Sequence, residues 1–334
     1  MYKLIQGDCI EVLRGLEDES VQCVVTSPPY YGLRDYGVVG QIGLEQSPEE
    51  YVAKLVAVFR EVRRVLRKDG TVWLVLGDSY ASGKGQSGSG GSEYQDKRNN
   101  NGESLNRGYQ TLGGPKETRP TDDRAMLREA GLKPKDLIGI PWRVAFALQA
   151  DGWWLRSDII WHKPNPMPES VTDRPTKSHE YMFLLTKSAR YYYDAEAVKE
   201  PLADSTLADK RNGKGRLTTS DNTKYDLPPY SWYRNRKFTD PALGRNLRSV
   251  WTIPTQSYSG AHFATYPEKL VEPCIKAGTK AGDVVLDPFC GSGTTGKVAV
   301  KLGRDFIGIE LNPEYIELAK KRIGDAVLPM LDEA

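Results

Sequence analysis

The sequence is poor in the residues that build metal centres and disulfide frameworks. It has four cysteines, none of them in a C-x-x-C pair, and only three histidines among 334 residues. A zinc site or a set of disulfide bridges needs more of these residues at closer spacing, so we expect no metal site and a reducing, cytosolic environment. The cysteines are spread along the chain, at Cys9, Cys23, Cys274 and Cys290.

Long apolar runs and an excess of charge are also missing. No stretch approaches the roughly 20 apolar residues of a membrane span, and the first residues, MYKLIQGDCIEVL, contain no apolar signal core. We therefore expect a soluble protein of the cytoplasm that has no membrane partner. The net charge is only +2 and the pI is near 8.2, so any surface that binds nucleic acid must be local.

Apolar patterns in the sequence alternate between those of strands and those of helices. The run TVWLVL at 71–76 is continuous and of strand length, which is typical of a strand covered on both faces. Before it, Ser47 and Pro48 supply a capping residue and a first-turn proline for a helix that we expect to end at Asp69-Gly70. This rhythm predicts an α/β fold with a doubly wound sheet. Further strands are predicted at 2–5, 21–26, 153–161, 180–186, 284–286 and 306–310, a hairpin strand at 190–194, and helices at 9–16, 134–150, 267–277, 294–302 and 313–323.

Two segments break this rhythm. Residues 81–130 are rich in Gly, Ser, Asn and charged residues, and we expect a mobile insertion there. In residues 195–256, Lys and Arg alternate with Tyr, Trp and Phe, which suits phosphate neutralisation together with base stacking. A solvated loop is the alternative interpretation of that segment. Its candidate nucleic-acid-binding residues are Arg234, Arg236 and Lys237.

A corner with the sequence Ser27-Pro28-Pro29-Tyr30 follows the strand predicted at 21–26. Two prolines fix the backbone there, since proline neither donates an N–H nor continues a strand interior. The Ser27 hydroxyl, the Pro28 carbonyl and the Tyr30 ring can then be presented together at the end of the strand. Two hydrogen-bond acceptors beside a stacking surface suit a planar ring that carries an exocyclic amine. A plain Pro-Pro turn with a surface tyrosine is the alternative.

A second candidate site follows the strand predicted at 284–286. Asp287 stands at the end of the strand, and a glycine-rich turn and the start of a helix come next. The pattern G-x-x-x-x-G-K-[ST] is absent, and Asp287 would repel a phosphate but attract an ammonium group. Glu310 ends the next strand, 23 residues later, near the spacing expected of an acid that binds ribose hydroxyls. An ammonium site and a ribose acid together describe a nucleoside that bears an amino acid, and S-adenosylmethionine fits best.

Together the two motifs resemble those of the amino-methylating DNA methyltransferases. DPFCGSGTT at 287–295 is followed by GIE at 308–310, and TSPPY at 26–30 lies about 260 residues earlier. This order is similar to that of the permuted, or β, class of the family, in which the catalytic motif precedes the cofactor motif. The resemblance implies a Rossmann-like, seven-stranded mixed sheet of the S-adenosylmethionine-dependent type, with an inserted target-recognition segment.

The resemblance also implies which residues surround the cofactor. Those around the methionine part would be Asp287, Phe289, Gly291 and Gly293, with Glu310 on the ribose. The adenine would be contacted by Asp8 and Cys9 of the early Gly-Asp corner, and the residues closing over the cofactor would be His262, Phe263 and Thr265. Structural alternatives stay open, with Asp8 as a helix cap, Phe289 as a core residue and His262 as an ordinary hydrogen-bonded histidine.

By the same resemblance, the reaction is direct methyl transfer to the exocyclic amine of a flipped-out base. Ser27 Oγ and the Pro28 carbonyl would accept the two amine hydrogens while Tyr30 stacks on the base, which must leave the duplex because its amine is paired there. Serine at position 27 accompanies cytosine-N4 methylation among relatives, so we expect that specificity. The alternatives are adenine-N6 methylation, RNA methylation and an inactive DNA-binding module. Candidates to hold the opened strand are Tyr31, Arg34 and Tyr36.

These assignments divide the chain into functional segments. We expect a catalytic half at 1–80, an insertion at 81–130, the continuation of the catalytic half at 131–194, a target-recognition region at 195–256 and a cofactor-binding half at 257–334. Double-stranded DNA is the expected partner, with a cognate restriction endonuclease where the protein is one of a restriction pair. We expect a monomer or a homodimer encoded by a prokaryote or a phage.

Overall fold

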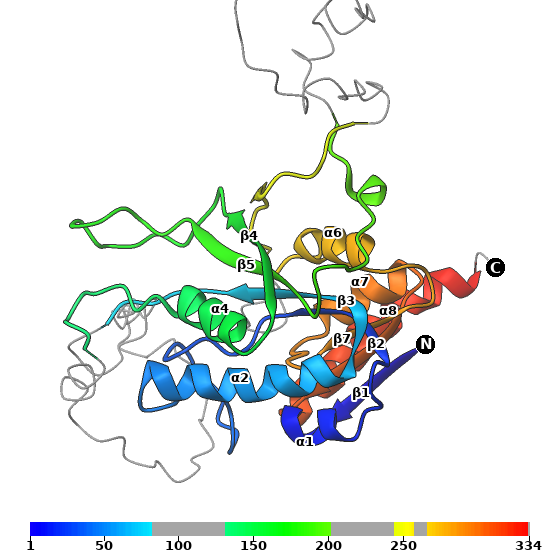
Figure 1. Cartoon of the computed structure of the whole chain (residues 1–334), viewed down its shortest axis with the longest axis horizontal. Coiled ribbons are helices and arrows are strands. Elements are labelled where there is room, and N and C mark those ends of the chain that lie inside the picture. Colours follow the sequence, from blue (N-terminus) through cyan, green and yellow to red (C-terminus); the bar gives the residue numbers. More distant parts are fainter. Residues whose placement is uncertain (82–130, 202–243, 257–265, 333–334) are drawn as a thin grey trace, which may run out of the picture. The chain divides into compact units, whose positions relative to one another are not determined.

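Eight strands of the described residues form one mixed sheet, drawn in Figure 1 from the computed structural model. The structure describes residues 1–81, 131–201, 244–256 and 266–332. The strands are β1 (Tyr2–Gln6), β2 (Val21–Thr26), β3 (Leu66–Leu76), β4 (Trp154–His162), β5 (His179–Thr186), β6 (Val250–Thr252), β7 (Val284–Asp287) and β8 (Asp305–Glu310). Their order in the sheet is β1-β8-β7-β2-β3-β5-β4-β6. All neighbours are parallel except β5, which is antiparallel to both β3 and β4.

The predicted α/β sheet is confirmed, but it has one strand more than the seven that the resemblance implies. The additional strand is β6, which pairs with the end of β4 and places Val250 opposite Ile160. Trp251, at the centre of β6, is buried, and its ring centroid lies 6.3 Å from that of Trp73 on β3. A strand of three residues is too short to show a periodic pattern, so the sequence indicated only an irregular segment there.

Two series of helices pack along the sheet (Figure 1). The first series is α1 (Cys9–Arg14), α2 (Pro48–Val65) and α4 (Ile140–Ala150), and the second is α6 (Glu268–Gly278), α7 (Thr294–Lys301) and α8 (Pro313–Asp332). Helix α2 begins as predicted, since Ser47 Oγ accepts a hydrogen bond from the Glu50 N–H at 3.1 Å and Pro48 opens the first turn. None of the helices in the described ranges is long and apolar enough to cross a membrane.

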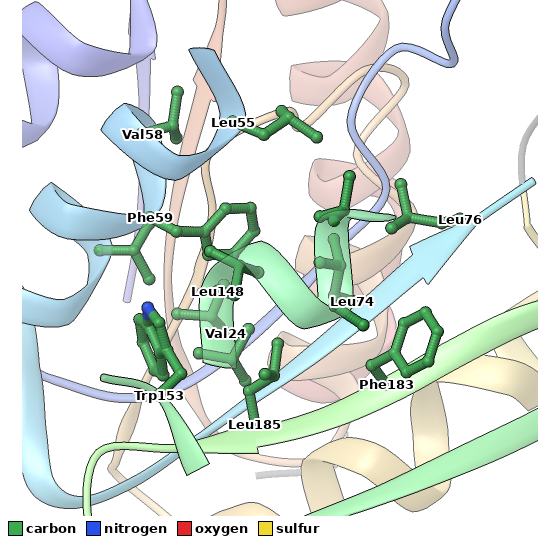
Figure 2. Close-up of a cluster of buried hydrophobic side chains, with 14 of the residues drawn as sticks. Val24, Leu55, Val58, Phe59, Leu74, Leu76, Leu148, Trp153, Phe183 and Leu185 are labelled. Carbon is green, nitrogen blue, oxygen red and sulfur yellow. The ribbon is translucent and has the colours of Figure 1, made fainter. Parts of the chain in front are cut away.

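A large hydrophobic core lies between the sheet and the first series of helices (Figure 2). Leu74 of β3, Phe183 of β5 and Phe59 of α2 meet in it. Trp73 and Val75 alternate with Leu74 along β3, so they point to the other face of the sheet, where α6 contacts β3. Burial on both faces confirms the interpretation of the continuous apolar run at 71–76.

The predicted end of α2 was wrong. The helix ends at Val65 rather than at Asp69-Gly70, because Leu66 takes an extended conformation and starts β3 opposite Val21 of β2. Gly70 lies inside the strand, where an added Cβ would stand 2.7 Å from the Leu66 side chain and 2.8 Å from the Gln22 carbonyl oxygen. The glycine therefore permits close packing beside β2 and does not terminate the helix.

Two further element boundaries also differ from the prediction. Helix α4 begins at Ile140 rather than near residue 134, since Pro141 has no N–H and fits only the first turn. No strand forms at 190–194, where we expected a hairpin strand. Instead, the N–H of Tyr192 donates to the carbonyl of Asp69 at 2.8 Å.

The chain divides into two compact units, one of Met1–Tyr193 with Ser249–Ala334 and one of Asp194–Arg248. The first unit contains the whole sheet and both series of helices. In the second unit, the Glu200 carboxylate accepts hydrogen bonds from Nε of Arg245 at 3.0 Å and from Nε of Arg248 at 2.9 Å. The functional division of the chain into a catalytic half, an insertion, a target-recognition region and a cofactor-binding half stays a prediction.

Candidate active site

The two sequence motifs meet at the carboxyl ends of two adjacent parallel strands. Strands β2 and β7 are paired, with Val24 opposite Leu286, so the corner after β2 and the glycine turn after β7 lie on the same edge of the sheet. Thr26 Oγ1 donates a buried 2.6 Å hydrogen bond to Asp287 Oδ1 across this edge. Ligands of open α/β sheets bind beyond the carboxyl ends of the strands, which makes this edge the candidate active site.

Asp287 is fully buried, and donors from several parts of the chain surround it. Oδ1 accepts from Thr26 Oγ1 at 2.6 Å and from the Phe289 N–H at 3.1 Å. Oδ2 accepts from Thr295 Oγ1 at 2.8 Å and from the Tyr266 hydroxyl at 3.0 Å. Burial raises the pKa of Asp287, and these hydrogen bonds oppose the shift. The carboxylate therefore ties the corner, the glycine turn and Tyr266 together, and its role as an ammonium site stays a prediction.

The glycine turn places its backbone against Glu310 at the end of β8. Gly291 has a φ of 51° and its N–H donates to Glu310 Oε2 at 2.8 Å, while the Asn312 N–H donates to Oε1 at 2.9 Å. Gly293 precedes α7 with a φ of 81°, and a Cβ there would lie 2.9 Å from the Ala319 Cβ. Burial raises the pKa of Glu310, against the pull of these backbone donors. Its carboxylate is thus fixed in orientation beside the turn.

Phe289 and Cys9 contribute mainly to packing. Phe289 is half-buried against the hydrophobic core, which agrees with the structural alternative for this residue. Cys9 begins α1 and is buried, and burial raises the pKa of its thiol to about 12. The thiol is therefore protonated at neutral pH. Contact of either residue with a cofactor stays a prediction.

Asp8 lies on the same edge and caps a helix. The N–H of Gly7, just before it, donates to the Glu310 carbonyl at 3.0 Å. Asp8 Oδ1 accepts from the N–H groups of Ile10 at 2.9 Å and Glu11 at 3.1 Å, so Asp8 is the N-cap of α1. The cap that we named as an alternative is present, and contact of Asp8 with an adenine ring stays a prediction.

The corner after β2 is held by hydrogen bonds to distant residues. The Tyr51 hydroxyl donates to the Pro29 carbonyl at 2.9 Å, and Tyr30 is half-buried, with its hydroxyl donating to Glu180 Oε2 at 2.6 Å. Ser27 Oγ lies 3.4 Å from the Tyr30 hydroxyl. The Tyr30 ring rests on Gly77, where an added Cβ would stand 2.4 Å from the ring. Pro28 is buried between Ser27 and Pro29.

A charged pair stands behind the corner. Glu180 is near the start of β5, and its Oε1 accepts a short hydrogen bond from Lys163, which follows the end of β4. The Lys163 ammonium also lies 4.3 Å from the centroid of the Trp161 ring. Burial and the charge of Glu180 raise the pKa of the Tyr30 phenol well above its usual value. Tyr30 is therefore a neutral hydrogen-bond donor across the physiological pH range.

The loop after the corner carries the three residues expected to hold an opened strand. Tyr31 packs against Tyr51, with ring centroids 5.6 Å apart. Tyr36 meets the Tyr315 ring of α8 edge-on at 6.3 Å, and burial raises the pKa of Tyr36. Arg34 is exposed. Their contact with DNA stays a prediction, as does that of Arg234, Arg236 and Lys237, which lie outside the described ranges. The residues expected to close over the cofactor, His262, Phe263 and Thr265, also lie outside the described ranges.

Comparison with known proteins places this geometry in a family. A family model for N6/N4 methyltransferases, described as DNA methylase, matches residues 21–321. The chain belongs to the DNA methylase family. The Type II methyltransferase M.Cfr9I of Citrobacter freundii is 48% identical over 322 residues, which cover 96% of this chain and 87% of that protein. M.SmaI of Serratia marcescens is also 48% identical, over 321 residues that cover 96% and 90%.

Solved structures share the fold of this DNA methylase. PvuII DNA methyltransferase (cytosine-N4-specific) gives a TM-score of 0.58 at 20% identity, covering 99% of this chain and 93% of that one. A DNA modification methylase from Thermus thermophilus, solved in complex with S-adenosyl-L-methionine, gives 0.55 at 24% identity, covering 98% and 96%. The methyltransferase fold expected from the motifs is therefore confirmed.

Sequence reasoning on this DNA methylase found both motifs but missed the residues that connect them to the fold. Thr26 stood inside the TSPPY motif without an assigned role, Tyr266 directly follows the residues expected to close over the cofactor but had no role either, and Glu180 belonged only to a predicted strand. A carboxylate at the start of an otherwise apolar strand, EYMFLLT, was the one local signal for Glu180. Within the described part of the chain, no group of His, Cys, Asp and Glu side chains is arranged to hold a metal ion.

Proposed function

We propose that this DNA methylase is a β-class enzyme that transfers a methyl group from S-adenosylmethionine to N4 of a flipped-out cytosine in double-stranded DNA. The observation that carries the proposal is the hydrogen bond between Thr26 and Asp287. It joins the amine-binding corner to the glycine turn, so the methyl acceptor and the methyl donor would bind at one edge of the sheet. Positioning of two reactants supplies much of the rate of such a reaction.

The residues of the glycine turn fit this cofactor. A carboxylate offers about four acceptor sites, and the two N–H groups on Glu310 leave others for the hydroxyls of a ribose. Gly291 has no side chain to keep a ligand from the turn. When bound, S-adenosylmethionine supplies an electrophilic methyl group on sulfur. Glu310 would orient the ribose, and the Gly291 to Gly293 turn would lie against the methionine part.

The corner would bind and polarise the target amine. Ser27 Oγ and the Pro28 carbonyl accept its two hydrogens, which raises electron density on the nitrogen. Tyr30 stacks on the base, and Pro29 keeps the corner rigid. Serine at position 27 supports cytosine as the target, and PvuII DNA methyltransferase, named as cytosine-N4-specific, shares the fold.

The identity of the methylated nucleoside tests this proposal. The purified protein is incubated with unmethylated genomic DNA and S-adenosylmethionine, and the digested nucleosides are identified by mass spectrometry. N4-methylcytosine is expected, at a level that falls at least about 100-fold with Ser27→Ala. N6-methyladenine would assign the same corner to adenine instead. Absence of any methylated nucleoside, with cofactor binding intact, would contradict DNA methylation by the chain alone.

We also propose that the enzyme protects DNA from a restriction endonuclease that reads the same site, in a prokaryotic or phage-infected cytoplasm. The support is that M.Cfr9I and M.SmaI are named Type II methyltransferases. DNA methylated by this protein is expected to resist cleavage by an endonuclease encoded beside it. Cleavage at an unchanged rate would contradict the pairing.

A further inference from the structure

A series of hydrogen bonds leads from the corner to the ion pair formed by Lys163, just after β4, and Glu180 of β5. Ser27 Oγ donates to the Tyr30 hydroxyl at 3.4 Å, the Tyr30 hydroxyl donates to Glu180 Oε2 at 2.6 Å, and Lys163 binds Glu180 Oε1. The side chains of Lys163 and Glu180 are only 18% and 17% exposed. A mostly buried ion pair is costly to form, so its location next to the corner suggests that it has a functional role. The function proposed above uses neither residue.

The carboxylate at the end fixes the direction of each hydrogen bond in the chain. An ionised carboxylate only accepts, so Tyr30 must donate its single proton to Glu180. The Tyr30 oxygen is then left to accept from Ser27, and the Ser27 proton points away from the target site. The lone pairs of Ser27 Oγ therefore face outward as acceptors, which is the state that an amine N–H needs.

Ser27 alone is not a sufficient acceptor for the proton that the reaction releases. When the N4 lone pair forms a bond to the methyl carbon, the carbon–sulfur bond breaks and sulfur keeps the bonding pair. The methylated nitrogen then carries one proton in excess. A hydroxyl is a weak base at neutral pH, whereas a carboxylate joined to Ser27 through hydrogen bonds can hold that proton.

We propose that Glu180, held by Lys163, sets the direction of the hydrogen bonds in the catalytic corner and is the final acceptor of the proton lost by the methylated amine. This inference rests on the methyl transfer proposed above. The excess proton passes from the amine to Ser27 Oγ as the Ser27 proton passes to Tyr30 and the Tyr30 proton to Glu180 Oε2. Ser27 and Tyr30 end neutral, and Glu180 ends protonated. Glu180 acts through Tyr30 and Ser27, so it is a positioning residue and not one that touches the substrate.

The weakest hydrogen bond between Ser27 and Glu180 is the one between Ser27 and Tyr30. Its 3.4 Å separation exceeds that of an ordinary hydroxyl hydrogen bond, and substrate binding is expected to shorten it. Gly77 fixes the position of the Tyr30 ring relative to Ser27, because the ring packs directly against the Gly77 backbone. The Tyr51 hydroxyl, bonded to the Pro29 carbonyl, holds the other side of the corner.

The test is a double-mutant cycle with Tyr30→Phe and Glu180→Gln. Both changes keep the size of the side chain and remove one link of the proposed chain. We measure the single-turnover rate of methyl transfer to DNA, the dissociation constants for S-adenosylmethionine and DNA, and the thermal midpoint. Glu61→Gln is the matched control, since Glu61 also pairs with an arginine, Arg64, but lies on α2 away from the corner.

Each single variant is expected to lower the transfer rate about 100-fold with binding and thermal midpoint little changed. The double variant should be no slower than the slower single variant, because both break one pathway. The inference would be overturned if Glu180→Gln left the transfer rate unchanged, or if the rate losses of the two single variants multiplied in the double variant. It would also be overturned if weaker binding or unfolding explained the loss of rate. A wild-type protein that transfers no methyl group to DNA would instead overturn the proposed function, and this inference with it.

Discussion

Two carboxylates near the candidate site, Asp287 and Glu180, are held in opposite ways. Asp287 is fully buried, and the four donors around it are uncharged, three hydroxyls and one backbone N–H. Glu180 is partly exposed and has a lysine on one oxygen and a tyrosine hydroxyl on the other. The first arrangement joins the corner, the glycine turn with the start of α7, and Tyr266 at one point. The second links the corner after β2 to an ion pair, so it suits the proton movement proposed above.

The difference indicates that the two carboxylates at this edge of the sheet have different roles, one in stability and one in rate. Removing Asp287 would leave several buried donors without an acceptor, which is costly for stability. Replacing Glu180 by an uncharged acceptor of the same size leaves fewer groups unpaired but removes the charge that directs the corner. Stability should therefore depend mainly on the first carboxylate and rate mainly on the second.

The largest effect is expected from Asp287→Ala. The Thr26, Thr295 and Tyr266 hydroxyls and the Phe289 N–H lose their shared acceptor, so the free energy of unfolding should fall by about 3 kcal/mol or more. Denaturant unfolding measures it. The control is Asp325→Ala, an exposed aspartate on α8, which should stay within about 0.5 kcal/mol of wild type. A loss under about 1 kcal/mol for Asp287→Ala would show that the buried network is not what holds the edge together.

Gly77→Ala should next separate rate from stability at the corner. The added Cβ would stand 2.4 Å from the Tyr30 ring, so the ring must shift, and the hydrogen bond from its hydroxyl to Glu180 is disturbed. We expect a loss of about 1–3 kcal/mol in unfolding free energy and a transfer rate lowered about 100-fold. Gly15→Ala is the control, since its Cβ would meet only the Val12 carbonyl oxygen at 3.4 Å. A normal rate for Gly77→Ala would mean that the position of Tyr30 does not matter.

Glu310→Gln tests the cofactor side with a smaller change. Glutamine has one acceptor oxygen in place of two, so either the Gly291 or the Asn312 N–H loses its partner, and the acceptor proposed for the ribose is weakened. Calorimetry should give about 10-fold weaker binding of S-adenosylmethionine, which is about 1.4 kcal/mol. Glu314→Gln, exposed at the start of α8, should bind as wild type does. Equal affinity in both variants would remove Glu310 from the binding site.

The smallest effect is expected at Glu268, whose carboxylate forms ion pairs with lysines and takes no part in the buried hydrogen-bond network. Burial of Glu268 raises its pKa, but Lys297 and Lys301 outweigh burial, so the net pKa is lowered from 4.5. A lowered pKa stabilises the fold above the unfolded value, and this contribution is lost as the pH falls through the folded value. Glu268→Gln should cost about 0.5 kcal/mol at pH 7 and nothing in strong acid.

Unfolding of wild type and Glu268→Gln across the acid range measures this contribution. Asp287 provides the contrast, because burial raises its pKa and its linkage therefore has the opposite sign. A Glu268→Gln cost that persisted unchanged in strong acid would contradict an origin in charge.

Local patterns predicted the elements that carry the site. The β-branched run before Ser27, the glycines after Asp287 and the Ser47-Pro48 cap each specify their own structure, and the strands and helix start that they predicted are present. Asp8 shows the limit of this, because a Gly-Asp corner is equally suited to a helix cap and to ligand contact. The structure has the cap.

Contacts between distant segments were not predictable from these patterns. Thr26 and Asp287 are 261 residues apart, and Tyr30 and Glu180 are 150 apart, so only the strand order brings them together. That order places β2 between β7 and β3, and β5 beside β3, which no periodicity in the sequence specifies. The short strand β6 was missed for the related reason that three residues carry no period.

The most direct test of the central claim compares cofactor binding with methyl transfer in Ser27→Ala. Wild type and variant are mixed with genomic DNA and S-adenosylmethionine labelled in the methyl group, and label in cytosine is followed through one turnover. We predict equal cofactor affinity and a transfer rate at least about 100-fold lower in the variant. Transfer at the wild-type rate by Ser27→Ala would contradict the account, because the chemistry would then lie outside the corner.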